Sequence, residues 1–355
     1  MKRIAVIGIR GFPGIQGGVE KHCENLYPLM EDNTFFTVYR RKPYLNHNLK
    51  KEYKNIKFID LPSTRIKGFE AVFHTFISTI HIIFDRPDAV HIHNIGPAMF
   101  APLLRLFMLR VILTYHSPNY EHKKWGFFSR NLLKLCELFA INFSNKIIFV
   151  NKFQMEKYSK RVLRKSCYIP NGVNQFSRSE YDGYLREKGI PKNDYVLAVG
   201  RLTQEKGFEY LVEAVNKTDE IKHLVIAGAS DHDQSYFNLL KKKDINKKVI
   251  FTGYTDGEDL CQLYSHARLF VLSSINEGFP LVLLEAMRYN LPLGVTDIPA
   301  THLVDIDREC YVPVADPDKM CDAIINALKS NDHKKEYNLS NYDWRTVAYD
   351  TLKLF

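Results

Sequence analysis

The chain has 355 residues, of which 45% are hydrophobic and 13% aromatic, enough for two domains with cores of their own. Its formal net charge is +9, and its six cysteines include no C-x-x-C pair. This composition argues against a disulfide-rich or zinc-ribbon protein and fits a reducing, cytoplasmic compartment. We expect no signal peptide before the first apolar run and no transmembrane helix, because Arg105 and Arg110 interrupt the longest apolar run.

The positive charge is concentrated in the first half of the chain. Residues 1–170 hold 27 Lys and Arg against 12 Asp and Glu, whereas residues 171–355 hold 22 against 28. A basic half is typical of a surface that faces an anionic partner, such as nucleic acid, anionic lipid or a phosphorylated substrate. General solubility is the alternative explanation for the same pattern.

The first apolar run is followed by the glycine-rich stretch GIRGFPGIQGGVEKHCENL, residues 8–26. Gly8, Gly11 and Gly14 are three residues apart, so the G-x-G-x-x-G fingerprint of a dinucleotide site is absent. The stretch ends in Gly17 and Gly18 before an expected helix, where bare backbone amides can approach a ligand closely. A plain strand-to-helix loop is the alternative.

Expected strands and helices then alternate along both halves. In the first half we expect strands at 4–9, 34–40, 56–61, 89–94, 111–116 and 146–151, and helices at 19–30 and 69–84, the second largely buried. In the second half we expect strands at 195–200, 223–228, 248–253, 269–274 and 291–296, and helices at 208–215, 257–267 and 280–289. This alternation predicts an α/β protein with two Rossmann-like parallel-sheet domains that face each other across a cleft.

A stretch rich in Asn, Gly, Ser and Pro, residues 169–183, predicts the boundary between the domains. We therefore expect a first domain at 1–170, a second at 171–340 and a terminal helix at 341–355 that returns to the first domain. Ligands of such sheets bind beyond the carboxyl ends of the strands, so the residues after each strand are the candidates for a site.

Two such strand ends in the second half carry charged residues. RLTQEKG follows one strand and places Arg201 and Lys206 before a helix, a combination suited to a diphosphate. After a later strand, Glu277 and Glu285 are separated as E-x7-E, where their oxygens could accept hydrogen bonds from sugar and ribose hydroxyls. Loop charge and helix-dipole partners are the plain alternatives.

Five stretches in this order resemble glycosyltransferase family four, which has the two-domain GT-B fold. They are GGVE at 17–20, TYH at 114–116, PNGV at 170–173, GRLTQEKG at 200–207 and EGFPLVLLEA at 277–286. The resemblance covers nearly the whole chain and implies a retaining transfer from a nucleotide-diphosphate sugar, with UDP as the most frequent nucleotide and GDP and dTDP open. It implies acceptor binding by the first domain, donor binding mainly by the second, and no metal or other cofactor.

The resemblance also implies roles for single residues. Arg201 and Lys206 would neutralise the leaving diphosphate, Glu285 would hold the ribose, and Glu277 and His116 would contact the donor sugar. Backbone and side-chain contacts to the donor would come from six further residues: Gly17, Gly18, Gly278, Phe279, Pro280 and Leu281. Asn171 and Tyr254 are two more candidates.

His91 and His93 share one face of an expected strand, an arrangement that metal sites use. No third ligand is evident in the sequence, so we predict no metal site. Two departures from the family pattern are Pro299 and Ala300 where glycines are common, and Asn290 at a helix end. The first leaves the local geometry of the donor loop open, but not the class of reaction.

The segment 122–134 interleaves basic and aromatic residues: Lys123, Lys124, Trp125, Phe127, Phe128, Arg130 and Lys134. Such a segment suits the surface of an anionic membrane, although we expect its continuation, residues 132–141, to pack in the core. The acceptor would then be a glycan or a polyprenyl-diphosphate-linked glycan used in cell-surface polysaccharide synthesis, at the inner face of a bacterial cytoplasmic membrane.

Two rival functions remain. A nucleotide-sugar 2-epimerase shares the architecture, but the first half lacks the catalytic carboxylate pattern that we would expect of one. A basic nucleic-acid-binding protein requires a basic stripe on a recognition element. Arg201 and Lys206 lie instead in the acidic half, at a strand end, so we expect no nucleic-acid partner.

Overall fold

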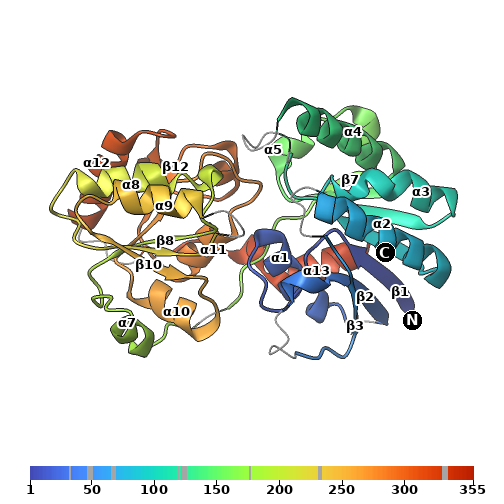
Figure 1. The fold of residues 1–355 in the computed structure, drawn as a ribbon, viewed down its shortest axis with the longest axis horizontal. Helices are drawn as coiled ribbons and strands as arrows, with labels where there is room; N and C mark the ends of the chain where they lie inside the picture. The colour runs from blue at the N-terminus through green and yellow to red at the C-terminus, as the bar shows by residue number, and fades with distance from the viewer. Residues whose placement is uncertain are drawn as a thin grey trace. The chain divides into compact units, whose positions relative to one another are not determined.

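The computed structural model describes residues 1–31, 33–45, 51–64, 69–118, 120, 126–175, 177–230, 234–329 and 335–355. They form two compact units, each with its own sheet (Figure 1). The first unit comprises Met1–Gly172 and Asn341–Phe355, and the second comprises Val173–Ser340. The chain therefore leaves the first unit once and returns to it with its last helix.

The first unit contains a seven-stranded parallel sheet in the order β3-β2-β1-β4-β5-β6-β7. Its strands are β1 (Lys2–Ile7), β2 (Thr34–Arg41), β3 (Ile56–Leu61), β4 (Ala89–His93), β5 (Arg110–Tyr115), β6 (Lys146–Phe149) and β7 (Ser166–Tyr168). The central strands are short runs of Ile, Val and Leu that are buried on both faces, as parallel sheets require. The strand order reverses between β1 and β4, so ligand chemistry is expected at the carboxyl ends of these two strands.

Helices cover both faces of this sheet (Figure 1). Helices α2 (Phe69–Asp85), α3 (Ala101–Leu106) and α4 (Phe127–Phe143) lie together on one face, joined by the 3-10 turn η3 (Pro97–Phe100). Helix α1 (Gly18–Leu26), the 3-10 turn η1 (Tyr27–Leu29) and the terminal helix α13 (Trp344–Leu352) contact one another on the other face. The short elements η2 (Lys42–Tyr44), α5 (Lys152–Met155) and α6 (Lys160–Leu163) complete the unit.

The second unit contains a six-stranded parallel sheet in the order β10-β9-β8-β11-β12-β13. Its strands are β8 (Val196–Val199), β9 (Leu224–Ala227), β10 (Val249–Gly253), β11 (Leu269–Leu272), β12 (Leu293–Thr296) and β13 (Tyr311–Val312). Its α-helices are α7 (Gly183–Glu187), α8 (Phe208–Asn216), α9 (Ser235–Lys243), α10 (Gly257–His266), α11 (Leu281–Arg288) and α12 (Pro317–Lys329). Its 3-10 turns are η5 (Gln204–Lys206), η6 (Pro299–Leu303) and η7 (Arg308–Cys310), and η8 (Ser340–Tyr342) lies where the chain returns to the first unit. The strand order reverses between β8 and β11.

The predicted fold class is confirmed: both sheets are parallel, and the terminal helix returns to the first unit. Two expectations of burial are wrong in part. Phe76, Ile80 and Phe84 of α2 are exposed, and so are Leu132, Leu135 and Leu138 of the segment 132–141, which we expected in the core. Their helices bury only one stripe each against the sheet, and the residues opposite that stripe remain at the surface.

Candidate active site

The loop after β1 is held by an ion pair that the sequence analysis did not foresee. Glu20, in the first turn of α1, accepts hydrogen bonds from the backbone N and from Nε of Arg10, at 3.1 and 3.2 Å. Burial alone would raise the pKa of Glu20, but the charge and hydrogen bonds of Arg10 outweigh it and lower that pKa. The pair fixes the glycine-rich loop at the carboxyl end of β1.

Gly17 and Gly18 differ in what surrounds them. A Cβ atom on Gly17, the N-cap of α1 with φ of 154°, would lie 2.0 Å from Glu20 Oε2 and 2.8 Å from Arg10 Nη2. Glycine is therefore needed at position 17 by the ion pair itself. A Cβ atom on Gly18 would meet nothing within 4 Å. No packing contact in the described part of the chain accounts for glycine at position 18.

Three histidines gather at the carboxyl ends of β4 and β5 beside α1. His93 ends β4, His116 follows β5, and His22 comes from α1; all three are buried. His93 Nδ1 lies 3.0 Å from His116 Nε2, and His22 donates from Nδ1 to Asn171 Oδ1 at 2.7 Å. The structure thus brings the predicted His116 and Asn171 into one cluster, through His22 and His93.

Behind this cluster, a hydrogen-bonded chain of side chains runs through the interior of the unit. The hydroxyl of Tyr27 lies 2.6 Å from His93 Nε2 and 2.7 Å from His91 Nδ1, and His91 Nε2 lies 2.7 Å from Thr114 Oγ1. His91 and His93 share one face of their strand, as expected, and that face meets Tyr27. The hydroxyl of Tyr27 therefore links His91 and His93, the two residues that we considered as metal ligands.

Burial keeps these histidines neutral. It lowers the pKa of His22 to about 4 and that of His91 to about 3. Burial, together with the neighbouring imidazoles, also holds the pKa of His93 and His116 well below the ordinary value. At neutral pH each ring therefore carries one proton, and each offers one donor and one acceptor nitrogen.

The same cluster contains a set of residues that could hold a metal ion. Ring nitrogens of His22, His93 and His116 all lie within 4.8 Å of one another, and Nε2 of His22 is buried without a partner. Three histidines are a common ligand set for zinc. In the structure, however, His93 and His116 already face each other at hydrogen-bond distance.

In the second unit, Lys206 and Glu277 form an ion pair at the carboxyl ends of β8 and β11. Lys206 Nζ lies 2.5 Å from Glu277 Oε1, and both side chains are largely buried. Ser274 also donates to Glu277 Oε1, at 2.7 Å. The two residues that we expected to contact the diphosphate and the donor sugar are thus partners, placed where the strand order reverses.

Gly207 fixes this geometry. It caps α8 in the left-handed conformation, with φ of 61°, and a Cβ atom there would lie 2.2 Å from the carbonyl oxygen of Ser273. The loop after β8 therefore packs directly on the end of β11, and Ser273 donates from Oγ to the Lys206 carbonyl at 2.8 Å. Lys206 ends η5 immediately before this cap, so its backbone lies at the N-terminus of α8, and its ammonium group is held by Glu277.

The remaining predicted residues of this unit lie around the start of α11 and after β10. Pro280 is the N-cap of α11, so the helix begins at Leu281, one residue later than expected, and Glu285 lies in its second turn. Glu285 Oε2 accepts from the hydroxyl of Tyr264 at 2.9 Å. Arg201 lies two residues after the end of β8, whereas Tyr254 directly follows β10 and donates a hydrogen bond from its hydroxyl to Asp256.

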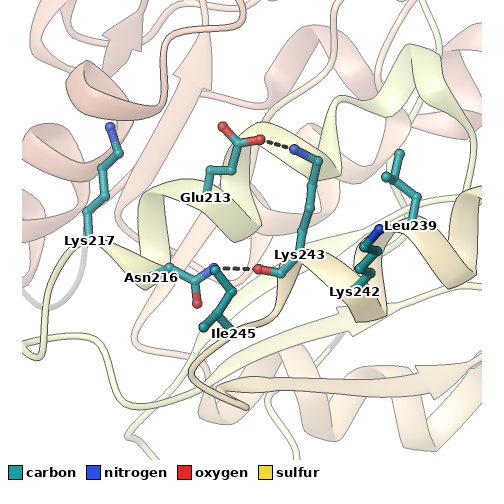
Figure 2. A pocket seen from close by; sticks show the side chains of 7 residues that line it. All are labelled: Glu213, Asn216, Lys217, Leu239, Lys242, Lys243 and Ile245. Atoms are coloured by element: carbon teal, nitrogen blue, oxygen red, sulfur yellow. Dashed lines mark hydrogen bonds and ion pairs between the residues drawn. The ribbon is translucent and has the colours of Figure 1, made fainter.

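A hollow of about 540 Å³ lies elsewhere in the second unit (Figure 2). It is lined by Glu213, Asn216, Lys217, Leu239, Lys242, Lys243 and Ile245, at and just beyond the C-terminal ends of α8 and α9. These ends lie at the amino edge of the sheet, because each helix runs back from the carboxyl end of the preceding strand. Inside the hollow Lys243 pairs with Glu213, so we assign it no part in the site.

Several residues of the site were not found from the sequence. They are Arg10, Tyr27, His22, Tyr264 and Ser274. Arg10 holds Glu20, and Tyr27 joins His91 and His93. The other three hydrogen-bond to predicted residues, namely Asn171, Glu285 and Glu277, respectively. Arg10 and His22 had a usable signal, since Arg10 directly follows the strand expected at 4–9 and His22 lies on the helix that follows the glycine-rich loop. The roles predicted for the site residues stay predictions.

Two family models together match most of the chain. The model described as Glycosyltransferase Family 4 matches residues 16–175, and the model described as Glycosyl transferases group 1 matches residues 184–344. They meet close to the junction of the two units. The chain therefore belongs to the family 4 glycosyltransferases with a group 1 second half, as the five sequence stretches indicated.

Relatives agree with this assignment. An uncharacterized glycosyltransferase of Methanocaldococcus jannaschii is 30% identical over 208 residues, 53% of this chain and about half the length of that protein. The O-antigen biosynthesis glycosyltransferase WclY of Escherichia coli is 25% identical over 263 residues, 70% of this chain and 72% of WclY. The structure of Anabaena HepE in complex with UDP-glucose has a TM-score of 0.80 and 15% identity, with 100% of both chains covered. That structural likeness shows the GT-B fold.

None of the helices in the described parts of the chain combines the length and the apolar character that a membrane-spanning helix requires.

Proposed function

We propose that this glycosyltransferase moves a sugar from a nucleotide-diphosphate sugar, with UDP as the nucleotide, to a glycan or lipid-linked glycan of a cell-surface polysaccharide. The observation that carries the proposal is the Lys206–Glu277 pair at the carboxyl ends of β8 and β11, where the strand order of the second sheet reverses and where Lys206 precedes α8 in the chain. A lysine, a helix N-terminus and the adjacent Arg201 together suit a diphosphate. The name of WclY and the UDP-glucose complex of HepE support the acceptor class and the donor, respectively.

In the proposed reaction the bond from the anomeric carbon to the diphosphate oxygen breaks, and a bond from that carbon to an acceptor hydroxyl oxygen forms with retention. The acceptor proton passes to the leaving diphosphate, so no protein base is required. Arg201 and Lys206 stabilise the negative charge that develops on the leaving group, which is the role that a metal ion has in other transferases. We therefore propose a metal-independent reaction.

The other predicted residues would contact different parts of the donor: the ribose, the sugar and the diphosphate. Glu285, already an acceptor for Tyr264, would hold the ribose hydroxyls, and Glu277 would accept from the sugar. In the first unit, His116 and the amides of Gly17 and Gly18 would contact the sugar and the diphosphate. His116 is neutral because burial lowers its pKa, so it would donate a hydrogen bond and would be a weak general base.

The acceptor side of the proposal rests on the exposed face of α2, α3 and α4. Thirteen large apolar side chains are exposed in these helices and in the residues that follow α3: Phe69, Phe76, Ile80, Phe84, Leu106, Phe107, Met108, Phe127, Phe128, Leu132, Leu135, Leu138 and Phe143. Phe128 and Met108 are 88% and 90% exposed. Arg105, Arg130 and Lys134 are exposed among them. Lys123, Lys124 and Trp125, also predicted to contact a membrane, lie outside the described residues.

A surface that combines apolar and basic side chains in this way suits an anionic membrane, where the apolar groups enter the interface and the basic groups meet lipid phosphates. We propose that this face, which we call the α2–α4 face, rests on the inner surface of the cytoplasmic membrane. A lipid-linked acceptor would reach the first unit there.

The proposal is tested by thermal stabilisation of the purified protein with UDP, GDP, dTDP or NAD, each with and without magnesium. We expect a rise in Tm with one nucleoside diphosphate, independent of magnesium and lost in Arg201→Ala. Lys242→Ala is the matched control, because it removes an exposed cation of the same unit in the hollow of Figure 2. Stabilisation by NAD alone, or equal loss in both variants, would refute the proposal.

A further inference from the structure

The buried side chains behind His116 form one continuous hydrogen-bonded chain with a definite direction. It runs Thr114 Oγ1 to His91 Nε2, His91 Nδ1 to Tyr27 Oη, Tyr27 Oη to His93 Nε2, and His93 Nδ1 to His116 Nε2. The four distances lie between 2.6 and 3.0 Å. We call these five residues the buried chain.

Neutral groups allow the buried chain only two arrangements of its protons. Each hydrogen bond holds one proton, and each imidazole carries one proton on one of its two nitrogens. Tyr27 has a single hydroxyl proton, so it donates to one histidine and accepts from the other. Choosing the direction at one end therefore fixes the donor and acceptor nitrogen of every ring, including His116.

One buried donor decides the direction. The hydroxyl of Thr114 is buried and has His91 Nε2 as its side-chain partner, so the reverse direction would leave its proton without an acceptor among the described residues. The Thr114 hydroxyl therefore requires that His91 Nε2 carries a lone pair. The thiol of Cys23 lies 3.6 Å from His93 Nε2, and because a thiol can donate or accept, this contact is compatible with either direction.

With this end fixed, the rest of the chain follows. Thr114 donates to His91 Nε2, His91 donates from Nδ1 to Tyr27, Tyr27 donates to His93 Nε2, and His93 donates from Nδ1 to His116 Nε2. His116 then holds its own proton on Nδ1. That nitrogen has no hydrogen-bond partner among the described residues, and His116 keeps 8% of its surface exposed.

We propose that Thr114, His91, Tyr27 and His93 are positioning residues that lock His116 in the Nδ1–H tautomer, so that it presents a fixed hydrogen-bond donor to an oxygen of the donor sugar. This inference rests on the proposed function for its last step, the contact with the sugar, but the tautomer itself is a property of the protein without ligand. A donor held in this way needs no reorganisation when charge develops in the transition state.

The first test is the tautomer in the unliganded protein, measured from the ring nitrogen chemical shifts of protein labelled with ¹⁵N-histidine. We expect His91, His93 and His116 all to be protonated on Nδ1 at pH 7, with no titration down to pH 5.5. Protonation of His116 on Nε2 would overturn the proposal. So would one zinc ion per chain by elemental analysis, because a metal-bound nitrogen carries no proton.

The second test breaks the chain in its middle. Tyr27→Phe removes the hydroxyl that joins His91 to His93, and we expect mixed tautomers at His116 and a kcat that falls in proportion to the fraction of His116 no longer protonated on Nδ1, about twofold for an equal mixture. Tyr39→Phe is the matched control: Tyr39 is also buried and bonds to a histidine, His81 at 2.9 Å, outside the buried chain. An unchanged His116 tautomer in Tyr27→Phe would overturn the proposal.

The two proposals fail separately. If the tautomers are as expected but no nucleotide sugar is used, the proposed function is wrong and the locked tautomer stands. If the enzyme transfers sugar while His116 is protonated on Nε2, the proposed function stands and the role of the buried chain is wrong.

Discussion

Gly17 and Gly18 show at the scale of single residues why one sequence pattern can have two causes. Both belong to the stretch that we expected to approach a ligand. In the structure the Arg10–Glu20 pair explains why residue 17 must be glycine, whereas no contact within the described chain requires glycine at position 18. The sequence does not separate these cases, because the partner of Gly17 depends on how the loop folds back on α1.

This difference predicts opposite outcomes for two alanine variants. Gly17→Ala should lower the free energy of unfolding by roughly 1–3 kcal/mol, because its Cβ atom would clash with the Glu20 carboxylate. Gly18→Ala should leave stability unchanged or raise it by up to about 1 kcal/mol, since alanine suits a helix better than glycine. It should nevertheless weaken the binding of the nucleotide sugar. Urea unfolding and calorimetric titration measure the two effects, and normal affinity in Gly18→Ala would contradict a backbone contact there.

At the scale of elements, the central strands of both sheets were predictable from the sequence, whereas the short edge strands and several of the helices were not. Runs of Ile, Val and Leu marked the central strands of both sheets. The edge strands β7 and β13 are three and two residues long and gave no pattern. Helices α3, α9 and α12 were also missed. The positions of the site residues at strand ends followed from the parallel sheets. The histidine cluster did not, because His22 and Tyr27 come from α1 and η1, and the sequence does not show which strands these two elements pack against.

The exposed residues of α4 give a prediction at the same scale. The double variant Phe128→Ser, Leu132→Ser should bind vesicles of anionic phospholipid at least about tenfold more weakly, since each apolar side chain that enters the interface contributes of the order of 1 kcal/mol or more. Stability should change little, because both side chains are exposed. Co-sedimentation at low salt measures the binding.

Ile245→Ser is the control for this experiment, because it removes an exposed apolar side chain from the second unit. Equal loss in the control and the double variant, or no binding of the wild type to anionic vesicles, would show that the α2–α4 face is not the membrane contact. Vesicles of zwitterionic lipid should bind less, because the exposed arginines and lysine each contribute about 1 kcal/mol with anionic lipid.

At the scale of the whole molecule, the two units differ in how they bury ionisable groups. His22, His74, His91, His93 and His116, the described histidines whose pKa burial lowers, all belong to the first unit. Folding therefore places an unusual number of neutral imidazoles inside one unit. The second unit instead carries its charges at strand ends and on its surface, as Lys206 and Glu277 illustrate.

This asymmetry predicts that acid unfolds the first unit before the second. Each of these histidines takes up a proton near pH 6.5 when the unit unfolds, but the pKa values of His22 and His74 in the folded unit are about 4. Below pH 6.5 the unfolded state thus binds more protons, and the free energy of unfolding falls as the pH falls. Between pH 7.5 and 5.5 the loss is about 1.4 kcal/mol per histidine, and five such losses approach the total stability of a domain.

Urea unfolding at pH 7.5 and 5.5 tests this, with fluorescence of the two tryptophans as the signal, because both lie in the part of the sequence that forms the first unit. His22→Asn should lose about 1.4 kcal/mol less than the wild type over the same interval, since it removes one titrating group. A free energy of unfolding that stays constant between the two pH values would mean that the imidazoles are hydrated or already protonated in the folded unit. The proposed direction of the buried chain behind His116 would then also be wrong, because it requires neutral histidine rings.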